Sequence, residues 1–577
     1  MYTSHTNSWG GATTALPGSQ FSSDFSSILF ENDFKAVFPE LFLVLASIIL
    51  LMYGVIASTS VEKRYPLILS NTCWLALGSL LISVSLLASV PCSDGYVFYN
   101  SLVLDDFTRF LKCILLVGAF LSLLISLNYI QQELINSFEF IILILLSTSS
   151  MLFLISSADF ISMYLAIEMQ SLCFYVMAAL KRNSEFSTEA GLKYFLLGAF
   201  SSGLLLFGCS LIYGFTGCTE FAQLVEIFEC GTEQITKSGL AVQENVYAAF
   251  QSSDARSGSE LASPLAFGEG TAIGMTYNIT EMLSVRGCEL GMIFILVGFL
   301  FKCTAVPFHM WAPDVYEGAP TAVTAFFSIA PKIALFGICI RVFLSGFYDF
   351  MGPWQKMLIF CSLASMILGA LAAMSQNKMK RLLAYSSIGH VGYLLVGLCC
   401  GTVEGVQALL IYLTIYIVMT VNLFAIILLH LGRHDTPSGV SISPWVQRVK
   451  YTTDLTQLGN TNPLIALSLA CTMFSIAGIP PLAGFYSKAA LFFAAVSSSQ
   501  YLLALFGVIT SVVSCFYYIR LVKIMYFEKK GMWCSFSRVA KSSSLPLALT
   551  FFFIISFMVY PSPLYLASHK CALSLCL

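Results

Sequence analysis

Two short motifs interrupt otherwise apolar stretches of this chain: Phe301-Lys302-Cys303-Thr304-Ala305-Val306-Pro307 and Gly478-Ile479-Pro480-Pro481-Leu482-Ala483-Gly484. In each motif a proline removes a backbone donor and clashes with the preceding helical turn. Within hydrocarbon, the carbonyls that are freed in this way must find partners in the protein or in water. A pair of Gly/Pro-broken spans at corresponding places in two halves of a chain is typical of transporter repeats. We therefore predict two broken membrane helices.

The composition excludes a water-soluble protein of this size. Of 577 residues, 57% are hydrophobic and only 10% are charged, and the mean hydropathy is +0.82. Soluble domains carry about 25% charged residues. The net charge of −2 gives no electrostatic support for nucleic-acid binding. The 18 cysteines include no Cys-x-x-Cys pair, so we predict no iron–sulfur or zinc site.

The apolar runs are long enough to cross a bilayer as helices. A hydrocarbon core about 30 Å thick needs about 20 apolar residues per helix. The runs are continuous rather than alternating, which excludes a β-barrel of membrane strands. The resulting prediction is an all-α polytopic protein with about fourteen spans, at 36–58, 67–90, 105–129, 137–156, 159–180, 190–215, 288–306, 319–345, 355–374, 381–401, 405–431, 462–497, 500–526 and 543–567. The seventh and twelfth spans carry the two breaks, and five segments separate them, which fits two five-helix repeats of opposite topology.

The distribution of Lys and Arg predicts the orientation in the membrane. Fourteen lie in loops that follow odd-numbered spans: Lys63, Arg64, Lys181, Arg182, Lys378, Lys380, Arg381, Arg433, Arg448, Lys450, Lys529, Lys530, Arg538 and Lys541. Six lie on the other side: Lys35, Lys237, Arg256, Arg286, Lys356 and Lys570. Basic loops stay on the cytoplasmic side, so the loops after odd-numbered spans are predicted on the cytoplasm-equivalent side. Both termini are therefore expected on the opposite side.

The predicted organisation has five parts. A polar N-terminal extension covers 1–34, helices 1–6 cover 35–215, and helices 7–14 cover 288–567. Between the two helical parts, 216–287 is an acidic hydrophilic loop insertion with nine acids against three bases. Residues 568–577 form a C-terminal tail. The N-terminus has neither the basic and apolar pattern of a secretory signal nor the Arg-rich pattern of a transit peptide.

Two charged residues are predicted to lie near the middle of the membrane. Glu168 comes nine residues after Asp159, which places it about 14 Å into its helix at about 1.5 Å per residue. Lys332 lies about 20 Å from either end of its span, too far for its side chain to reach water. A charge at this depth is a functional candidate by default. The alternatives are a protonated structural glutamate for Glu168 and a structural ion pair for Lys332.

Four further residues are candidates. Lys302 is deep in its span and is followed by Pro307. Lys488 follows the second break, and the alternative for it is a lysine that reaches water at a helix end. His390 lies in an apolar helix, where a satisfied core histidine and a proton relay are equally compatible with the sequence. Lys193 lies near the start of its span, where its amine can also reach water.

Lysine and glutamate together can move protons. Burial and cationic neighbours favour release of a lysine proton, whereas a nearby carboxylate favours its retention. A Glu–Lys pair whose separation changes is therefore a switch, and a row of lysines along a wet interior path is a relay.

Three stretches closely resemble subunit 2 of NADH:ubiquinone oxidoreductase, respiratory complex I. They are Phe301-Lys-Cys-Thr-Ala-Val-Pro-Phe-His-Met-Trp-Ala-Pro-Asp-Val-Tyr-Glu-Gly318, Lys380-Arg-Leu-Leu-Ala-Tyr-Ser-Ser-Ile-Gly-His-Val-Gly-Tyr393 and Phe474-Ser-Ile-Ala-Gly-Ile-Pro-Pro-Leu-Ala-Gly-Phe485. The sequence is most similar to the plant mitochondrial form, as in Thr188-Glu-Ala-Gly-Leu-Lys-Tyr194 and Cys515-Phe-Tyr-Tyr-Ile-Arg-Leu-Val-Lys-Ile-Met-Tyr526. Residues 1–33 and about 228–285 depart from that pattern.

This resemblance implies an antiporter-like, proton-translocating membrane-arm subunit in the mitochondrial inner membrane. By motif, Glu168 matches the fifth-helix glutamate, Lys302 its seventh-helix partner, Lys332 the central lysine and Lys488 the twelfth-helix lysine. His390 falls between the last two. The resemblance further implies no cofactor in this chain, since NADH, FMN, iron–sulfur clusters and ubiquinone bind to other subunits. The implied partners are those subunits, including neighbouring antiporter-like ones, and phospholipids.

Two alternative functions are compatible with the residues. One is a self-standing cation/proton antiporter, which would exchange ions in liposomes without partners. The other is a non-pumping scaffold in which the buried charges are only structural.

Overall fold

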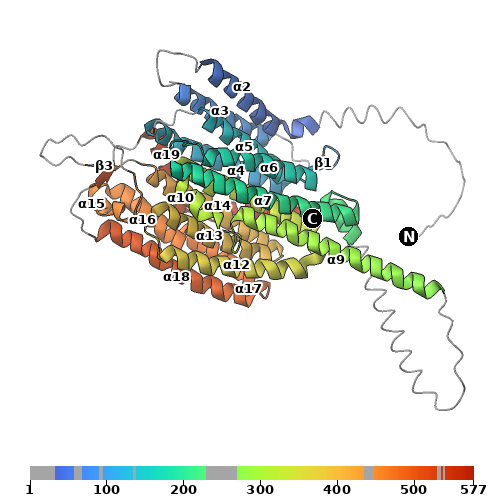
Figure 1. Ribbon diagram of the computed structural model, residues 1–577. Helices are drawn as coiled ribbons and strands as arrows, with labels where there is room; N and C mark the ends of the chain where they lie inside the picture. Colours follow the sequence, from blue (N-terminus) through green and yellow to red (C-terminus); the bar gives the residue numbers. More distant parts are fainter. Residues whose placement is uncertain are drawn as a thin grey trace, which may run out of the picture.

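The computed structural model describes residues 33–57, 68–89, 95–133, 138–228, 269–429, 431–433, 448–528, 534–536 and 540–576. Nearly all of the N-terminal extension expected at 1–34 lies outside these residues. So does the middle of the acidic insertion expected at 216–287. The described residues form one bundle of roughly parallel and antiparallel helices (Figure 1).

Three helices precede the repeats. They are α2 (Phe38–Ala57), α3 (Ile68–Ser89) and α4 (Asp106–Gln132), with a short antiparallel hairpin of β1 (Gly95–Val97) and β2 (Leu102–Leu104) before α4. A second two-stranded antiparallel sheet pairs β3 (Leu431–Arg433) with β4 (Cys534–Phe536), which are distant in sequence, and it lies at the opposite end of the bundle from β1 (Figure 1). The two small sheets mark the two ends of the bundle.

Two groups of five spans follow, and the fourth span of each group is broken. The first group comprises α5 (Glu139–Ser156), α6 (Phe160–Ala178), α7 (Glu185–Thr216), α9 (Glu269–Cys303) with the short α10 (Trp311–Gly318), and α11 (Thr321–Arg341). The second comprises α12 (Met351–Met374), α13 (Met379–Cys399), α14 (Val403–Ile427), the pair α16 (Pro463–Ala477) and α17 (Ala483–Ser497), and α18 (Tyr501–Tyr526). The chain ends with α19 (Lys541–Ser556) and α20 (Ser562–Cys576).

The predicted all-α membrane fold is confirmed. Eleven described helices are long and apolar enough to cross a membrane. The three remaining predicted spans correspond to α9, to the α16–α17 pair and to α19. Helices α16, α17 and α19 are apolar but shorter than the eleven. The breaks in spans seven and twelve lie where the two proline motifs predict them.

The helix α11 forms the centre of the bundle. All of its residues are buried, and α14, which packs beside it, is buried over nearly its whole length. A helix that is hydrophobic on every side needs protein or lipid around it. Here protein surrounds it, so the charged Lys332 on α11 faces protein rather than lipid.

Two predicted boundaries differ from the structure. Helix α9 begins at Glu269 rather than near 288, and it projects beyond the end of the bundle near β1 (Figure 1). Hydropathy marks only the part of a helix that lies in lipid, so it does not report this polar extension. At the other boundary, the span expected at 543–567 is divided, because α19 ends at Ser556 and α20 begins at Ser562, directly after Pro561. Helix α20 also covers most of the tail expected at 568–577.

The second break depends on a glycine at the start of α17. A Cβ atom at Gly484 would lie 1.8 Å from the carbonyl oxygen of Ser475 on α16, and the Gly484 amide donates to the Ser475 hydroxyl at 3.0 Å. The two half-helices therefore approach each other more closely than any side chain allows.

We expect Gly484→Ala to disrupt this break and to lower the thermal stability of the protein, by about 1–3 kcal/mol or more as in overpacked cores. The matched control is Gly203→Ala on α7, where an added Cβ meets no atom within 4 Å. Thermal unfolding in detergent distinguishes the two variants. Equal stability of both variants would contradict the steric argument.

Candidate functional site: a buried row of ionisable side chains

Lys488 occupies the second break. Helix α16 ends at Gly478, whose φ of +89° is left-handed, and the turn leaves two carbonyls at the helix end without helical partners. The Lys488 amine donates to both of them, at 2.9 Å to Ile476 and 3.0 Å to Ala477. A cation at the carboxyl end of a helix is also favoured by the helix dipole. The amine is therefore fixed in the interior rather than extended to water.

Lys302 lies on the last turn of α9, just before the first break, and is half-buried. Its amine donates to the Tyr175 hydroxyl on α6 at 3.3 Å. Glu168 lies seven residues earlier on α6, on the same face as Tyr175. Its carboxylate interacts electrostatically with Lys302, but no ion pair within 4.0 Å joins them, and the buried Glu168 Oε1 has no hydrogen-bond partner among the described residues. The Glu168–Lys302 pair is thus open in this structure.

Lys332 lies on α11 and is 3% exposed. Its amine donates to the Tyr416 hydroxyl on α14 at 2.7 Å and lies 4.6 Å from the centre of that ring. Among the described residues no carboxylate lies within 4.0 Å of the amine, so the geometry does not support the alternative of a structural ion pair.

His390 lies between Lys332 and Lys488. Its Nδ1 shares a hydrogen bond of 2.5 Å with the Tyr412 hydroxyl, and its Nε2 lies 3.5 Å from the Tyr518 hydroxyl. The Tyr518 hydroxyl also bonds to Ser386. These contacts satisfy the imidazole and place it within a network of hydroxyls, so both interpretations of this histidine stand.

Three small cavities connect these side chains. Lys302 and Lys332 line the first, Tyr416 and His390 line the second, and His390 and Lys488 line the third. The space open to the centres of water molecules is about 30, 30 and 10 Å³ respectively. One water molecule needs about 10–15 Å³ by this measure. The first and second cavities therefore each have room for about two waters and the third for one.

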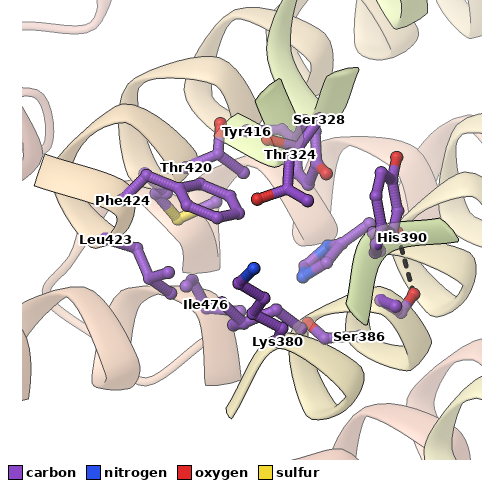
Figure 2. Close-up of a pocket in the computed structure, with 15 residues that line it drawn as sticks. Thr324, Ser328, Lys380, Ser386, His390, Tyr416, Thr420, Leu423, Phe424 and Ile476 are labelled. Atoms are coloured by element: carbon purple, nitrogen blue, oxygen red, sulfur yellow. Dashed lines mark hydrogen bonds between the residues drawn. The ribbon is translucent and has the colours of Figure 1, made fainter. Parts of the chain in front are cut away.

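The second cavity is lined by hydroxyls as well as by charged groups (Figure 2). Thr324, Ser328, Lys380 and His390 turn their polar atoms toward the same space. Lys380, at the start of α13, also donates to the Ala319 carbonyl at 2.8 Å. This cavity therefore extends from the middle of the bundle toward the end that carries the basic loops.

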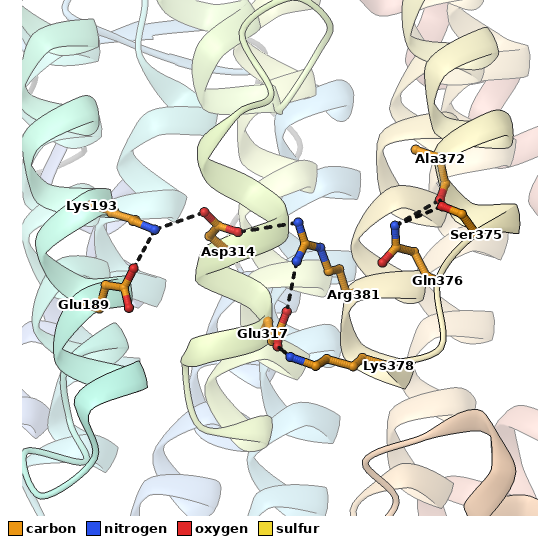
Figure 3. A network of polar contacts seen from close by, with 9 residues as sticks. All are labelled: Glu189, Lys193, Asp314, Glu317, Ala372, Ser375, Gln376, Lys378 and Arg381. Atoms are coloured by element: carbon orange, nitrogen blue, oxygen red, sulfur yellow. Dashed lines mark hydrogen bonds and ion pairs between the residues drawn. The ribbon is translucent and has the colours of Figure 1, made fainter.

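Lys193 does not join this row. Its amine pairs with Glu189 at 2.6 Å and with Asp314 at 3.1 Å, and its side chain is 42% exposed. Asp314 continues the network to Arg381, which also pairs with Glu317 (Figure 3). Lys193 does not line any of the three cavities. The placement favours the surface interpretation of this lysine.

Several polar residues of the row carry no charge and were missed by sequence reasoning. Tyr175, Tyr412 and Tyr416 lie in apolar helices where a tyrosine is unremarkable. Gln170 and Thr304 line the first cavity, and their buried Oε1 and Oγ1 atoms have no protein partner among the described residues. Unpaired buried polar atoms beside a cavity of this size indicate bound water.

One buried charge pair lies outside the row. The Lys112 amine on α4 is 2.5 Å from Glu40 Oε1 on α2, and the two side chains are 2% and 1% exposed. Sequence reasoning missed both residues. The depth argument that identified Glu168 would have found Lys112, since it lies seven residues into the span predicted at 105–129.

No group of three His, Cys, Asp or Glu side chains among the described residues is placed to hold a metal ion. The chemistry that the row supports is proton transfer, because amines, imidazole and hydroxyls are joined by hydrogen bonds and by space for water. Electron transfer would need a bound redox group, and the sequence predicts none in this chain.

Comparisons with known proteins show the family and the fold to which this chain is similar. Residues 157–253 and 268–514 match the family described as NADH:quinone oxidoreductase/Mrp antiporter, TM. The chain is 54% identical to NADH-ubiquinone oxidoreductase chain 2 of Marchantia polymorpha, covering 95% of this chain and 100% of that one, and 50% identical to the Arabidopsis thaliana protein, covering 94% and 97%. A chain of respiratory complex I from Thermus thermophilus superimposes with a TM-score of 0.67 at 24% identity, covering 91% of this chain and 98% of that one.

Proposed function

This chain belongs to the NADH:quinone oxidoreductase/Mrp antiporter transmembrane family, and we propose that it translocates protons as a membrane-arm subunit of respiratory complex I in the mitochondrial inner membrane. Its relatives over nearly the whole length are chain 2 proteins of NADH-ubiquinone oxidoreductase. In this proposal, oxidation of NADH and reduction of ubiquinone take place in other subunits.

The observation that carries the proposal is the buried row from Lys302 through Lys332 and His390 to Lys488. Lys302 and Lys332 share the first cavity, the Tyr416 hydroxyl joins Lys332 to the second, and His390 and Lys488 share the third. A charge in the membrane interior is unfavourable by several kcal/mol unless it serves a function or is paired. Lys332 has no carboxylate partner among the described residues, so its charge is better explained by transient protonation than by a structural role.

In the proposed mechanism Glu168 controls the first lysine. When Glu168 and Lys302 approach, the carboxylate stabilises the Lys302 cation. When they separate, as here, the proton can pass through the first cavity to Lys332 and onward past His390 to Lys488. Electron transfer elsewhere in the complex resets the Glu168–Lys302 distance.

We expect Glu168→Gln to lower this chain's contribution to the number of protons pumped per NADH by about tenfold. The complex should still assemble. The amide keeps the size of the carboxylate but cannot attract the Lys302 cation. The matched control is Glu185→Gln, an exposed carboxylate at the start of α7. Proton uptake by membrane vesicles during NADH oxidation measures the ratio, and an unchanged ratio in Glu168→Gln would refute the switch.

A further inference from the structure

One hydrogen bond joins a side chain that lines the first cavity to a side chain that lines the second. Lys332 lines the first cavity but not the second, and Tyr416 lines the second but not the first. The 2.7 Å bond from the Lys332 amine to the Tyr416 hydroxyl is therefore the polar connection between the two spaces. Tyr316 lines both cavities, but no hydrogen bond joins its hydroxyl to Lys332.

Protein encloses this connection on every side. Tyr416 is 2% exposed, and among the described residues its hydroxyl is the sole hydrogen-bond partner of the Lys332 amine. The Tyr416 ring packs against His390 with 5.1 Å between ring centres. A proton that leaves Lys332 toward His390 therefore meets the Tyr416 hydroxyl first.

A phenol hydroxyl is suited to this position, because it can donate and accept a hydrogen bond at the same time. An ammonium group can only donate. Water in the second cavity can accept the phenol proton, because that cavity has room for about two molecules and is lined by Thr324 and Ser328 hydroxyls.

We propose that Tyr416 is the proton-transfer residue between Lys332 and the His390 cavity. The protonated Lys332 gives one proton to the Tyr416 oxygen as that oxygen gives its own proton to water in the second cavity. Lys332 becomes neutral, Tyr416 is a neutral phenol before and after, and the water carries the charge toward His390. This inference rests on the proposed function. It gives Tyr416 a role that follows neither from the row of charged residues nor from the sequence motifs.

Tyr416→Phe tests the proposal in the assembled complex. The variant keeps the ring and its contact with His390 but removes the hydroxyl. We expect proton translocation through this chain to fall at least tenfold, with assembly and thermal stability close to those of the unmodified protein. The matched control is Tyr129→Phe, which removes a buried hydroxyl that accepts from the Thr321 amide at 3.1 Å at the start of the same helix α11. That control should lower thermal stability and leave the pumping ratio unchanged.

The outcomes separate this inference from the proposed function. If Lys332→Met loses pumping and Tyr416→Phe does not, the tyrosine proposal is overturned and the function stands. If neither variant loses pumping, the function itself fails. Should Tyr416→Phe not assemble, Tyr416→His supplies the test, since an imidazole can also accept one proton while it donates another. Pumping within about threefold of the unmodified ratio is then expected, and its loss in an assembled complex would overturn the proposal.

Discussion

Lys332→Met is expected to stop proton translocation through this chain while the complex still assembles. Methionine is unbranched and adaptable, so it fills the buried space that the lysine stem leaves. No carboxylate among the described residues pairs with Lys332, so the substitution leaves no unpaired charge behind. We expect the proton flux through this chain to fall about 100-fold or more, the range for loss of a proton-transfer group.

The measurement is the number of protons taken up per NADH oxidised by sealed vesicles. The matched control is Lys356→Met, an exposed lysine on α12 that lies outside the row. Both variants remove one positive charge, so an effect limited to Lys332→Met assigns the loss to the row and not to charge alone. Pumping at the unmodified ratio in Lys332→Met would instead support the scaffold alternative, in which the buried charges are only structural.

The membrane fold could be predicted because the bilayer constrains the sequence so strongly. Each span needs a long apolar run, and a proline within such a run leaves carbonyls that must be satisfied elsewhere. The break at Pro480-Pro481 illustrates this, since the amine of Lys488 satisfies two of the carbonyls. Outside the lipid the constraint disappears. The polar start of α9 therefore had no hydropathy signal.

The charged members of the site could be predicted from their depth alone, whereas their partners could not. Lys302 and Tyr175 are 127 residues apart in sequence, and Lys332 and Tyr416 are 84 apart. Which tyrosine meets which lysine depends on how the helices pack, and one sequence carries no record of that packing. Depth also failed to separate Lys193 from the row, because a lysine near a helix start can face either water or the interior.

For the buried pair of Lys112 and Glu40, we expect substitution to change stability, whereas for Lys332 we expect it to change pumping. The pair joins α2 to α4 at 2.5 Å, with both side chains almost completely buried, and Glu40 Oε2 has no hydrogen-bond partner in the part of the chain that the structure describes. Lys112→Met would leave the Glu40 carboxylate buried without its cation. Breaking a buried pair from one side is unfavourable by about 3–5 kcal/mol. We therefore expect Lys112→Met to lower the thermal stability and the amount of assembled complex sharply.

The double variant Lys112→Met with Glu40→Leu distinguishes a lost pair from a lost amine. Replacing both partners by apolar residues of similar size is often neutral or stabilising, because neither charge must then be removed from water. We expect the double variant to recover most of the stability that Lys112→Met loses. Lys570→Met is the control for an exposed pair, since Lys570 bonds to Asp106 at 2.7 Å but is 71% exposed, and its loss should change stability little.

The two buried lysines therefore differ in the two properties that the variants test, which are the pumping ratio and the stability of the complex. Lys332 has a hydroxyl partner and cavities on its route, so removing it should abolish pumping and preserve stability. Lys112 has a carboxylate partner and lines none of the three cavities, so removing it should reduce stability, and the complexes that do assemble should pump at the unmodified ratio. A lower ratio in assembled Lys112→Met would show that protons also use the Glu40–Lys112 pair. In that case the row from Lys302 to Lys488 would not be the whole path.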